Sequence, residues 1–265
     1  MPEELAGIGP LTVAMLVLAF FVGLTLNALA IGFLVERLLP KKKIFAVPLA
    51  KGQYRFEAIG NVVFILVTTT AVTLALVTNA VRFGASSATR GFATFGALLV
   101  GFQIFYFSLH RVMHTRPLLF MHRWHHRSRV TSPLSGQSVG ALEACAWMLG
   151  YVGLPILFSR IEPISFIGWA AYLVFNVSGN IVGHANVEPT AKRAATRLAS
   201  VFANPFVYHA LHHARWTVNF AFQASIMDRV FGTEAPDWEE LYARVSSGNP
   251  MTHMDERGRS TVRET

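Results

Sequence analysis

The sequence predicts an all-α, polytopic membrane bundle with a helical cap outside the bilayer. Three observations carry this prediction: the composition, a succession of long apolar stretches, and the grouping of the histidines. Of the 265 residues, 52% are hydrophobic and only 14% are charged, and the mean hydropathy is +0.41. Soluble domains carry about 25% charged residues, so a chain this apolar cannot be covered by water on all sides. The single cysteine, Cys145, excludes an internal disulfide.

Apolar stretches of membrane-spanning length recur along the chain. The first three, 11–35, 58–81 and 91–109, are each close to or above the ~20 residues that cross a bilayer as a helix. Two shorter stretches, 141–158 and 164–183, could be two tilted spans or a re-entrant hairpin, so we expect about four transmembrane helices.

The polar ends of the chain complete the predicted organisation. Residues 1–245 are expected to form one membrane-embedded domain. The last residues, 246–265, are rich in Ser, Gly, Thr and charge, a composition typical of disorder. We therefore expect a disordered polar tail.

The distribution of charge predicts the orientation. A net charge of +8 and a pI near 10.1 suggest nucleic acid in a soluble protein, but here the basic residues form no stripe on a soluble face, and we expect no nucleic-acid partner. Loop 36–57 holds six Lys and Arg residues, whereas turn 82–90 holds two. The positive-inside rule places loop 36–57 in the cytoplasm. Successive crossings then bring 111–129 and 184–265 to the same side, so every histidine is expected at the cytoplasmic face of a multi-pass membrane protein.

Nine of the ten histidines fall in four places, and the tenth, His253, lies in the tail. An HxxxH motif comes first, then HxxHH, then a single histidine, then a second HxxHH. Residues three and four apart share a helix face, so each HxxHH is expected to present three rings on one face. One histidine at a membrane edge is usually an interfacial hydrogen-bonding group, but nine at these spacings on one side predict a metal site. The predicted ligands are His110, His114, His122, His125, His126, His184, His209, His212 and His213.

The number of imidazoles indicates two metal ions. A tetrahedral zinc needs four ligands, and nine nitrogens suit two ions with four or five each. Imidazole binds Fe, Cu, Ni and Zn, and of these iron, unlike zinc, can change oxidation state and activate O2. A membrane metal transporter or metal-binding protein with a His-lined path is the alternative, although its spans would carry more ionisable residues. A bis-His haem carrier is a third possibility, which does not explain the adjacent His pairs.

The order of the motifs resembles that of the sterol desaturase/fatty acid hydroxylase superfamily of integral-membrane di-iron enzymes. Tyr106 precedes His110-Arg111, as in the aromatic lead-in of that family. Residues 219–221, Asn-Phe-Ala, resemble its Asn-Tyr-Gly, and residues 228–233, Asp-Arg-Val-Phe-Gly-Thr, are similar to its WDRLFGT ending. The resemblance covers about 92–233, and residues 51–57 are similar to the C-5 sterol desaturase branch.

This resemblance implies an O2-dependent oxidoreductase with two iron ions. It would hydroxylate or desaturate a lipid, of sterol or fatty-acyl type, that arrives from the bilayer. Electrons would come from a separate partner, a ferredoxin or a cytochrome b5-type protein with its reductase. The chain departs from the family pattern where Gln103 replaces an Asp and Gly140 replaces a His. The residues expected to orient the ligand imidazoles through hydrogen bonds are Gln103, Glu143, Asn186 and Asn219.

Overall fold

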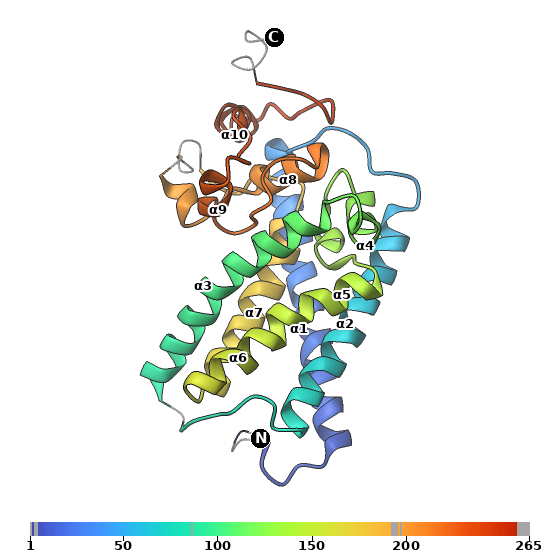
Figure 1. Cartoon of the computed structure of the whole chain (residues 1–265). Helices are drawn as coiled ribbons and strands as arrows, with labels where there is room; N and C mark the ends of the chain where they lie inside the picture. Colours follow the sequence, from blue (N-terminus) through green and yellow to red (C-terminus); the bar gives the residue numbers. More distant parts are fainter. Residues whose placement is uncertain (1, 3–4, 86, 192–195, 197, 259–265) are drawn as a thin grey trace.

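The computed structural model describes residues 2, 5–85, 87–191, 196 and 198–258, and within these residues it contains helices and no strand. The helices form two layers, a bundle of long helices and a cap of short ones at one end (Figure 1). The bundle consists of α1 (Pro10–Leu38), α2 (Gln53–Val77), α3 (Ala88–Met113), the continuous segment α5–η5–α6 (Ala141–Met148, Leu149–Gly153, Leu154–Ile161) and α7 (Phe166–Gly183). The predicted fold class is therefore confirmed.

Five helical segments are long and apolar enough to cross a membrane, and the chain is an integral membrane protein. The stretch for which a re-entrant hairpin was considered gives two of them, Ala141–Ile161 and Phe166–Gly183. These two segments run in opposite directions between the two ends of the bundle (Figure 1). The second span begins earlier than expected, at Gln53 rather than at 58, because the polar Glu57 is buried inside the bundle instead of remaining in the loop.

Local sequence signals explain where several helices begin and bend. α1 starts with a proline in its first turn, where a missing N–H costs nothing. The Ser87 hydroxyl caps α3 by accepting from the Arg90 N–H, and the Ser165 hydroxyl caps α7 by accepting from the Gly168 N–H. Pro155 offers no N–H to the carbonyl of Tyr151, which accepts instead from the Trp169 indole at 3.1 Å. This bond ties the π-helical turn η5 to α7.

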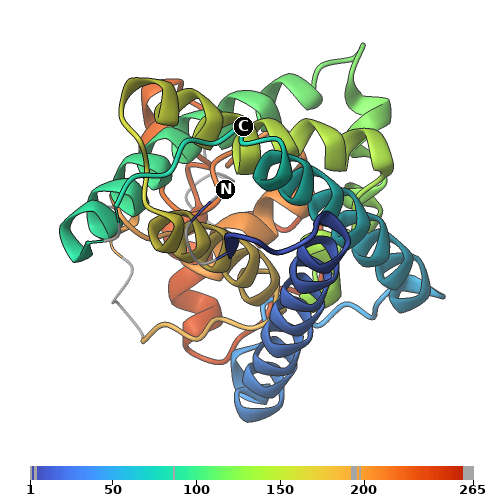
Figure 2. The ribbon, with the colours of Figure 1, turned by 90° about the horizontal axis from the view of Figure 1, so that it is seen from below.

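Apolar and aromatic side chains fill the centre of the bundle. α1 packs against α2 and α7, and α3 packs against α7, as the view from below shows (Figure 2). Phe102 on α3 contacts the Tyr151 and Tyr172 rings at centroid distances of 5.2 and 5.6 Å. Large apolar side chains on the outer faces, such as Leu26 and Val100, remain exposed, as expected where lipid rather than water is the solvent.

The cap is built from short helices around a second apolar core. Its elements are η2 (Pro40–Lys42), α4 (Leu119–His122), η3 (His125–Arg127), η4 (Pro133–Gln137), η6 (Ala199–Val201), α8 (Phe206–Arg215), α9 (Ile226–Val230) and α10 (Trp238–Ser246). Tyr208 and Leu211 on α8 pack with Trp238 and Tyr242 on α10. This core seats α8, which carries three of the histidines, against the end of the bundle.

The first part of the tail contacts the cap. Met251 is fully buried, and its backbone exchanges hydrogen bonds with Ile44 and Ala46. A buried apolar anchor and two backbone bonds hold this part of the tail on the cap. The disorder expected for 246–265 stays a prediction. Residues 259–265 lie outside the described residues.

Candidate metal centre

Nine histidines converge where the bundle meets the cap, and they come from elements far apart in the sequence. His110 lies in the last turn of α3 and His114 caps that helix, His184 caps α7, and the others come from α4, η3 and α8. Eight of these side chains are buried and His114 is half-buried. The short helices α4 and α8, which carry four of them, lie at the end of the bundle that carries loop 36–57 (Figure 1). The tenth histidine, His253, is exposed in the tail.

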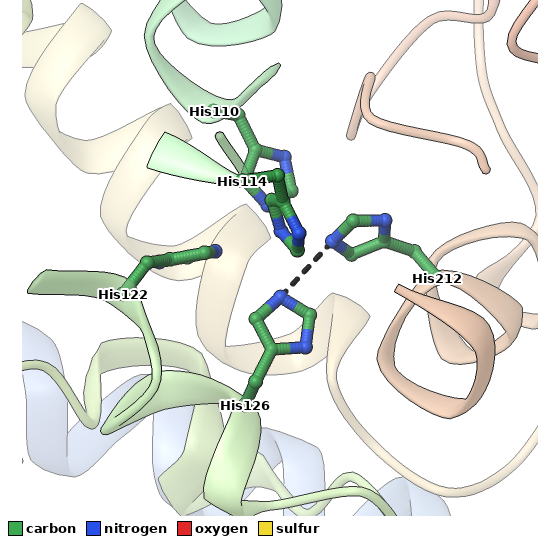
Figure 3. Close-up of side chains that lie close together, drawn as sticks. All are labelled: His110, His114, His122, His126 and His212. Carbon is green, nitrogen blue, oxygen red and sulfur yellow. Dashed lines mark hydrogen bonds between the residues drawn. The ribbon is translucent and has the colours of Figure 1, made fainter. Parts of the chain in front are cut away.

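The nine rings form two groups, each of which could hold a metal ion. In each group, every residue offers one ligand atom, and these atoms lie within 4.8 Å of one another. Figure 3 shows the rings of the first group turned toward a shared centre. The two groups are adjacent, since the rings of His126 and His213 are 4.7 Å apart. The five-histidine group is His110, His114, His122, His126 and His212, and the four-histidine group is His125, His184, His209 and His213.

Each HxxHH motif divides its rings between the two groups, which corrects the expectation of three rings on one face. On α8, His209 and His213 are four residues apart and share the four-histidine group, whereas His212 contributes to the other. In the first motif, α4 ends at His122 and a 3-10 turn begins at His125. As on α8, the histidines four residues apart, His122 and His126, stay together, and His125 belongs to the four-histidine group. Adjacent histidines therefore serve different centres.

Main-chain carbonyls fix the orientation of four rings. The Nδ1 atom of His110 lies 2.6 Å from the Phe220 carbonyl, and that of His212 lies 2.7 Å from the Val218 carbonyl. The Asn180 carbonyl lies 2.6 Å from His184 Nδ1 and the Ser128 carbonyl 2.9 Å from His213 Nδ1. A carbonyl oxygen can only accept, so Nδ1 carries the proton and the Nε2 lone pair points the other way.

Those lone pairs face one another at distances that suit a shared ion. In the four-histidine group, Nε2 of His184 lies 3.0 Å from that of His209 and 3.2 Å from that of His213. His184 and His213 have no Nε2 proton to share, so their contact is not a hydrogen bond. Nitrogens bound at 2.0–2.1 Å to one ion lie about 3.0 Å apart in adjacent octahedral positions and about 3.4 Å apart in a tetrahedron. The donor set therefore fits a metal ion.

The five-histidine group shows the same arrangement. Nε2 of His126 lies 3.1 Å from Nε2 of His212. Among the described residues, the buried Nε2 atoms of His110, His114 and His122 have no hydrogen-bond partner. Buried nitrogens without partners are costly, and a cation at their common centre would satisfy all of them.

Burial keeps the rings outside the spans in the neutral form that binds metals. Desolvation, followed by repulsion from neighbouring histidines, lowers the pKa of His114 to about 3, and desolvation alone lowers that of His122 to about 3. Desolvation is also the main cause that lowers the pKa of His125 to about 4. Ligands must be deprotonated to coordinate, so the folded cap presents them ready for a cation near neutral pH.

A tight loop, 218–221, supplies both carbonyls for the five-histidine group. Asn219 lies between them with a φ of 55°, in the left-handed region that asparagine tolerates. Its side chain donates to the Tyr208 carbonyl at 2.9 Å and accepts from the Ala235 N–H at 2.7 Å. The buried Asp228 carboxylate accepts from the N–H groups of Phe220 and Ala221 at 2.9 and 2.8 Å. These bonds hold the loop against α8.

The four residues predicted to orient the ligand imidazoles have different hydrogen-bond partners. Glu143 lies against a ring: its Oε1 is 2.6 Å from His122 Nδ1 and also accepts from the Trp147 indole. Asn186 bonds both backbone groups of Phe45, and Gln103 donates to Gln223. Asn219 acts on its own loop. Of the four, Glu143 has a hydrogen bond to a histidine ring in the described part of the chain.

Residues 95–233, more than half of the chain, match the sequence model of the family described as fatty acid hydroxylase. The chain belongs to the fatty acid hydroxylase family. The resemblance predicted from the histidine motifs is thus confirmed.

Curated relatives of this family member are plant proteins. The chain is 28% identical over 166 residues to very-long-chain aldehyde decarbonylase GL1-6 of Oryza sativa subsp. indica, covering 60% of this chain and 26% of the rice protein. It is 27% identical over 148 residues to very-long-chain aldehyde decarbonylase CER1 of Arabidopsis thaliana, covering 54% of this chain and 23% of that protein. The chain spans about a quarter of the length of these relatives. No solved structure matches it significantly.

Sequence reasoning missed one buried carboxylate that belongs to this fatty acid hydroxylase site. Glu57 on α2 accepts hydrogen bonds from the hydroxyls of Ser128 and Ser132, each at 2.7 Å, and from the Gln53 amide at 2.8 Å. It thereby holds the segment whose Ser128 carbonyl orients His213. Its signals were a place just before an apolar stretch, where such residues usually lie in solvent, and the resemblance of residues 51–57 to the C-5 sterol desaturase branch.

Proposed function

We propose that the protein is a membrane-bound di-iron oxidoreductase that uses O2 and external electrons to hydroxylate or desaturate a lipid. The observation that carries the proposal is the pair of histidine groups, with Nδ1 atoms anchored and Nε2 atoms converging. Family membership supports a lipid-modifying enzyme, and imidazole-rich sites suit iron. Hydroxylation balances as a C–H bond, O2, two electrons and two protons giving an alcohol and water. Bound iron would supply the redox chemistry for O2 activation.

The chain's own contribution is to hold the ligands and exclude water. Five histidines would hold one ion and four the other, while carbonyls and Glu143 fix the ring orientations. A cavity of about 20 Å³ beside His122 and His125, enough for about one water molecule, is lined by aromatic side chains, among them Phe64 and Tyr106, and by the polar Glu143 and Asn180. The aromatic residues belong to the membrane helices, so we expect a lipid chain to enter from the bilayer and place one carbon near the metals.

The names of the relatives support a second substrate candidate. Both plant proteins are named very-long-chain aldehyde decarbonylases, and the part of this chain that matches the family model contains all nine histidines. A long-chain aldehyde is therefore the first alternative to a sterol or a fatty-acyl lipid. The product distinguishes them, because loss of the carbonyl carbon gives a chain one carbon shorter.

We also propose that the metal centre lies on the cytoplasmic side and receives electrons from a ferredoxin or a cytochrome b5-type partner. The six Lys and Arg residues of loop 36–57 support this orientation. A reporter fused after residue 265 tests it: cytoplasmic green fluorescence is expected, and activity of a periplasmic or luminal reporter would contradict it.

The decisive experiment combines metal analysis with product chemistry on the full chain in nanodiscs. We expect about two iron ions per chain and lipid oxidation only with both O2 and a reductant. His125→Ala and His212→Ala should each abolish turnover, whereas His253→Ala in the exposed tail is the matched control. Full turnover in either ligand variant would reject its role. Metal flux into liposomes without oxygen consumption would favour a transporter instead.

A further inference from the structure

A cavity of about 440 Å³ lies where the membrane bundle meets the cap, and no histidine lines it. Its wall is formed by the end of α1, the start of α2, the loop between them, and two short segments, 131–132 and 186–187. The volume falls within the roughly 300–1,000 Å³ of small-molecule sites. This hollow is thus large enough for a lipid headgroup and lies at the level where two spans end.

The charged groups on the wall favour an anion. Arg37 and Lys43 line the cavity, and neither forms an ion pair within the described residues. The one carboxylate on the wall, Glu36, is engaged by the Asn186 N–H at 2.8 Å. Two cations against one carboxylate leave a net positive wall.

Apolar surface continues from the cavity along the membrane helices. Phe33 on α1 and Tyr54 on α2 both line it and contact each other edge-to-face at 6.1 Å. Leu34 and Leu38 on α1 and Ile59 on α2 are exposed on the same ends of these helices. Tyrosine is typical of the headgroup level, so acyl chains on α1 and α2 would bring a headgroup to the cavity.

We propose that this cavity binds the phosphate headgroup of an anionic phospholipid, with Arg37 and Lys43 on the phosphate. Basic pockets between transmembrane helices recognise anionic headgroups in this way. The bound lipid contacts both segments next to the four-histidine group. Thr131 follows Ser128, whose carbonyl orients His213, and Asn186 follows His184 by two residues.

Native mass spectrometry of the delipidated full chain, titrated with phosphatidylglycerol, tests the proposal. The variant Arg37→Gln/Lys43→Gln removes both cations of the wall. The matched control, Lys51→Gln/Arg55→Gln, removes the same charge from exposed residues nearby that do not line the cavity. We expect the first pair to weaken binding about thirty-fold and the control to change it less than threefold.

Each other outcome overturns the proposal. Equal losses in the two paired variants would indicate general surface attraction rather than a site. Phosphatidylcholine binding as tightly as phosphatidylglycerol would remove the role of the negative charge. Inorganic phosphate binding as tightly as the lipid would identify a free-anion site instead. Unchanged binding in Arg37→Gln/Lys43→Gln would show that the lipid lies elsewhere.

Discussion

The Glu143 carboxylate lies 2.6 Å from Nδ1 of His122, and both side chains are buried. It is the one carboxylate that contacts any of the nine rings among the described residues. Unlike the main-chain carbonyls that orient four other rings, it can be removed by a single substitution. Substitution of Glu143 is therefore the most direct test of how the five-histidine group is oriented.

Glu143→Ala should lower metal occupancy of the five-histidine group and, if the proposed function holds, turnover. Loss of a partner that orients a ligand typically costs 10–100-fold in metal affinity or activity. Glu143→Gln keeps an acceptor oxygen for His122 and should lose less. Metal content per chain and the iron Mössbauer spectrum are the measurements. Trp147→Phe, which removes the other bond of the same carboxylate, is the control, and full occupancy in Glu143→Ala would contradict the role.

Acidification should destabilise the metal-free protein. Burial lowers the pKa of His122 from 6.5 to about 3 and that of His125 from 6.5 to about 4. The unfolded chain binds more protons between these values, so stability is complete above about pH 6.5 and falls as the pH drops toward 4. Each such histidine contributes about 1.4 kcal/mol per pH unit. Thermal unfolding of chelator-treated protein at pH 7, 6, 5 and 4 measures the effect.

Two variants test whether the buried histidines cause this pH dependence. His122→Asn should flatten the pH dependence, whereas His253→Asn, in the exposed tail, should leave it unchanged. A melting temperature that does not change between pH 7 and pH 4 would be inconsistent with buried neutral histidines.

Loop 218–221 should depend on both the backbone and the side chain of Asn219. Asn219→Gly keeps the positive φ but loses the two side-chain bonds, while Asn219→Ala loses the bonds and also strains the backbone. We expect the alanine variant to be less stable than the glycine variant by about 1 kcal/mol. Denaturation midpoints of the two proteins check this difference. Equal midpoints would mean that the left-handed conformation is not maintained.

Gly136 should be intolerant of any side chain. A Cβ atom there would lie 2.7 Å from the Asn180 carbonyl oxygen and 2.8 Å from the Ile181 Cα. Asn180 is the residue whose carbonyl orients His184, so Gly136→Ala should cost about 1–3 kcal/mol and lower occupancy of the four-histidine group. Gly140→Ala is the control, because a Cβ at Gly140 meets nothing within 4 Å. Equal stability of the two variants would contradict the close packing described here.

The convergence of histidines four residues apart was predictable, because such residues lie on the same side of an α-helix. His209 and His213 lie four residues apart on α8 and reach the same centre, as helical geometry requires. Within each HxxHH motif the division follows the same rule, since the histidines four residues apart share a group and the third joins the other group. Which histidines from different motifs share a group was not predictable, because it depends on how α4, η3 and α8 are placed by tertiary contacts.

The supporting residues were harder to predict for a physical reason. Glu143 has a side chain whose chemistry suggested a role, and the structure places it on His122. The other acceptors are the carbonyls of Ser128, Asn180, Val218 and Phe220. Every residue has a carbonyl, so nothing in the letters of the sequence distinguishes these four.

Because main-chain carbonyls orient four of the imidazole rings, side-chain substitutions in evolution or in engineering affect those rings only indirectly. The four carbonyl acceptors cannot be deleted by changing a side chain; they move only when the path of the backbone moves. Substitutions at Val218 or Phe220 that preserve that path leave the imidazole tautomers intact. Transplanting the nine histidines onto another helical scaffold would not reproduce the centre unless the segments that follow η3 and α8 were copied as well.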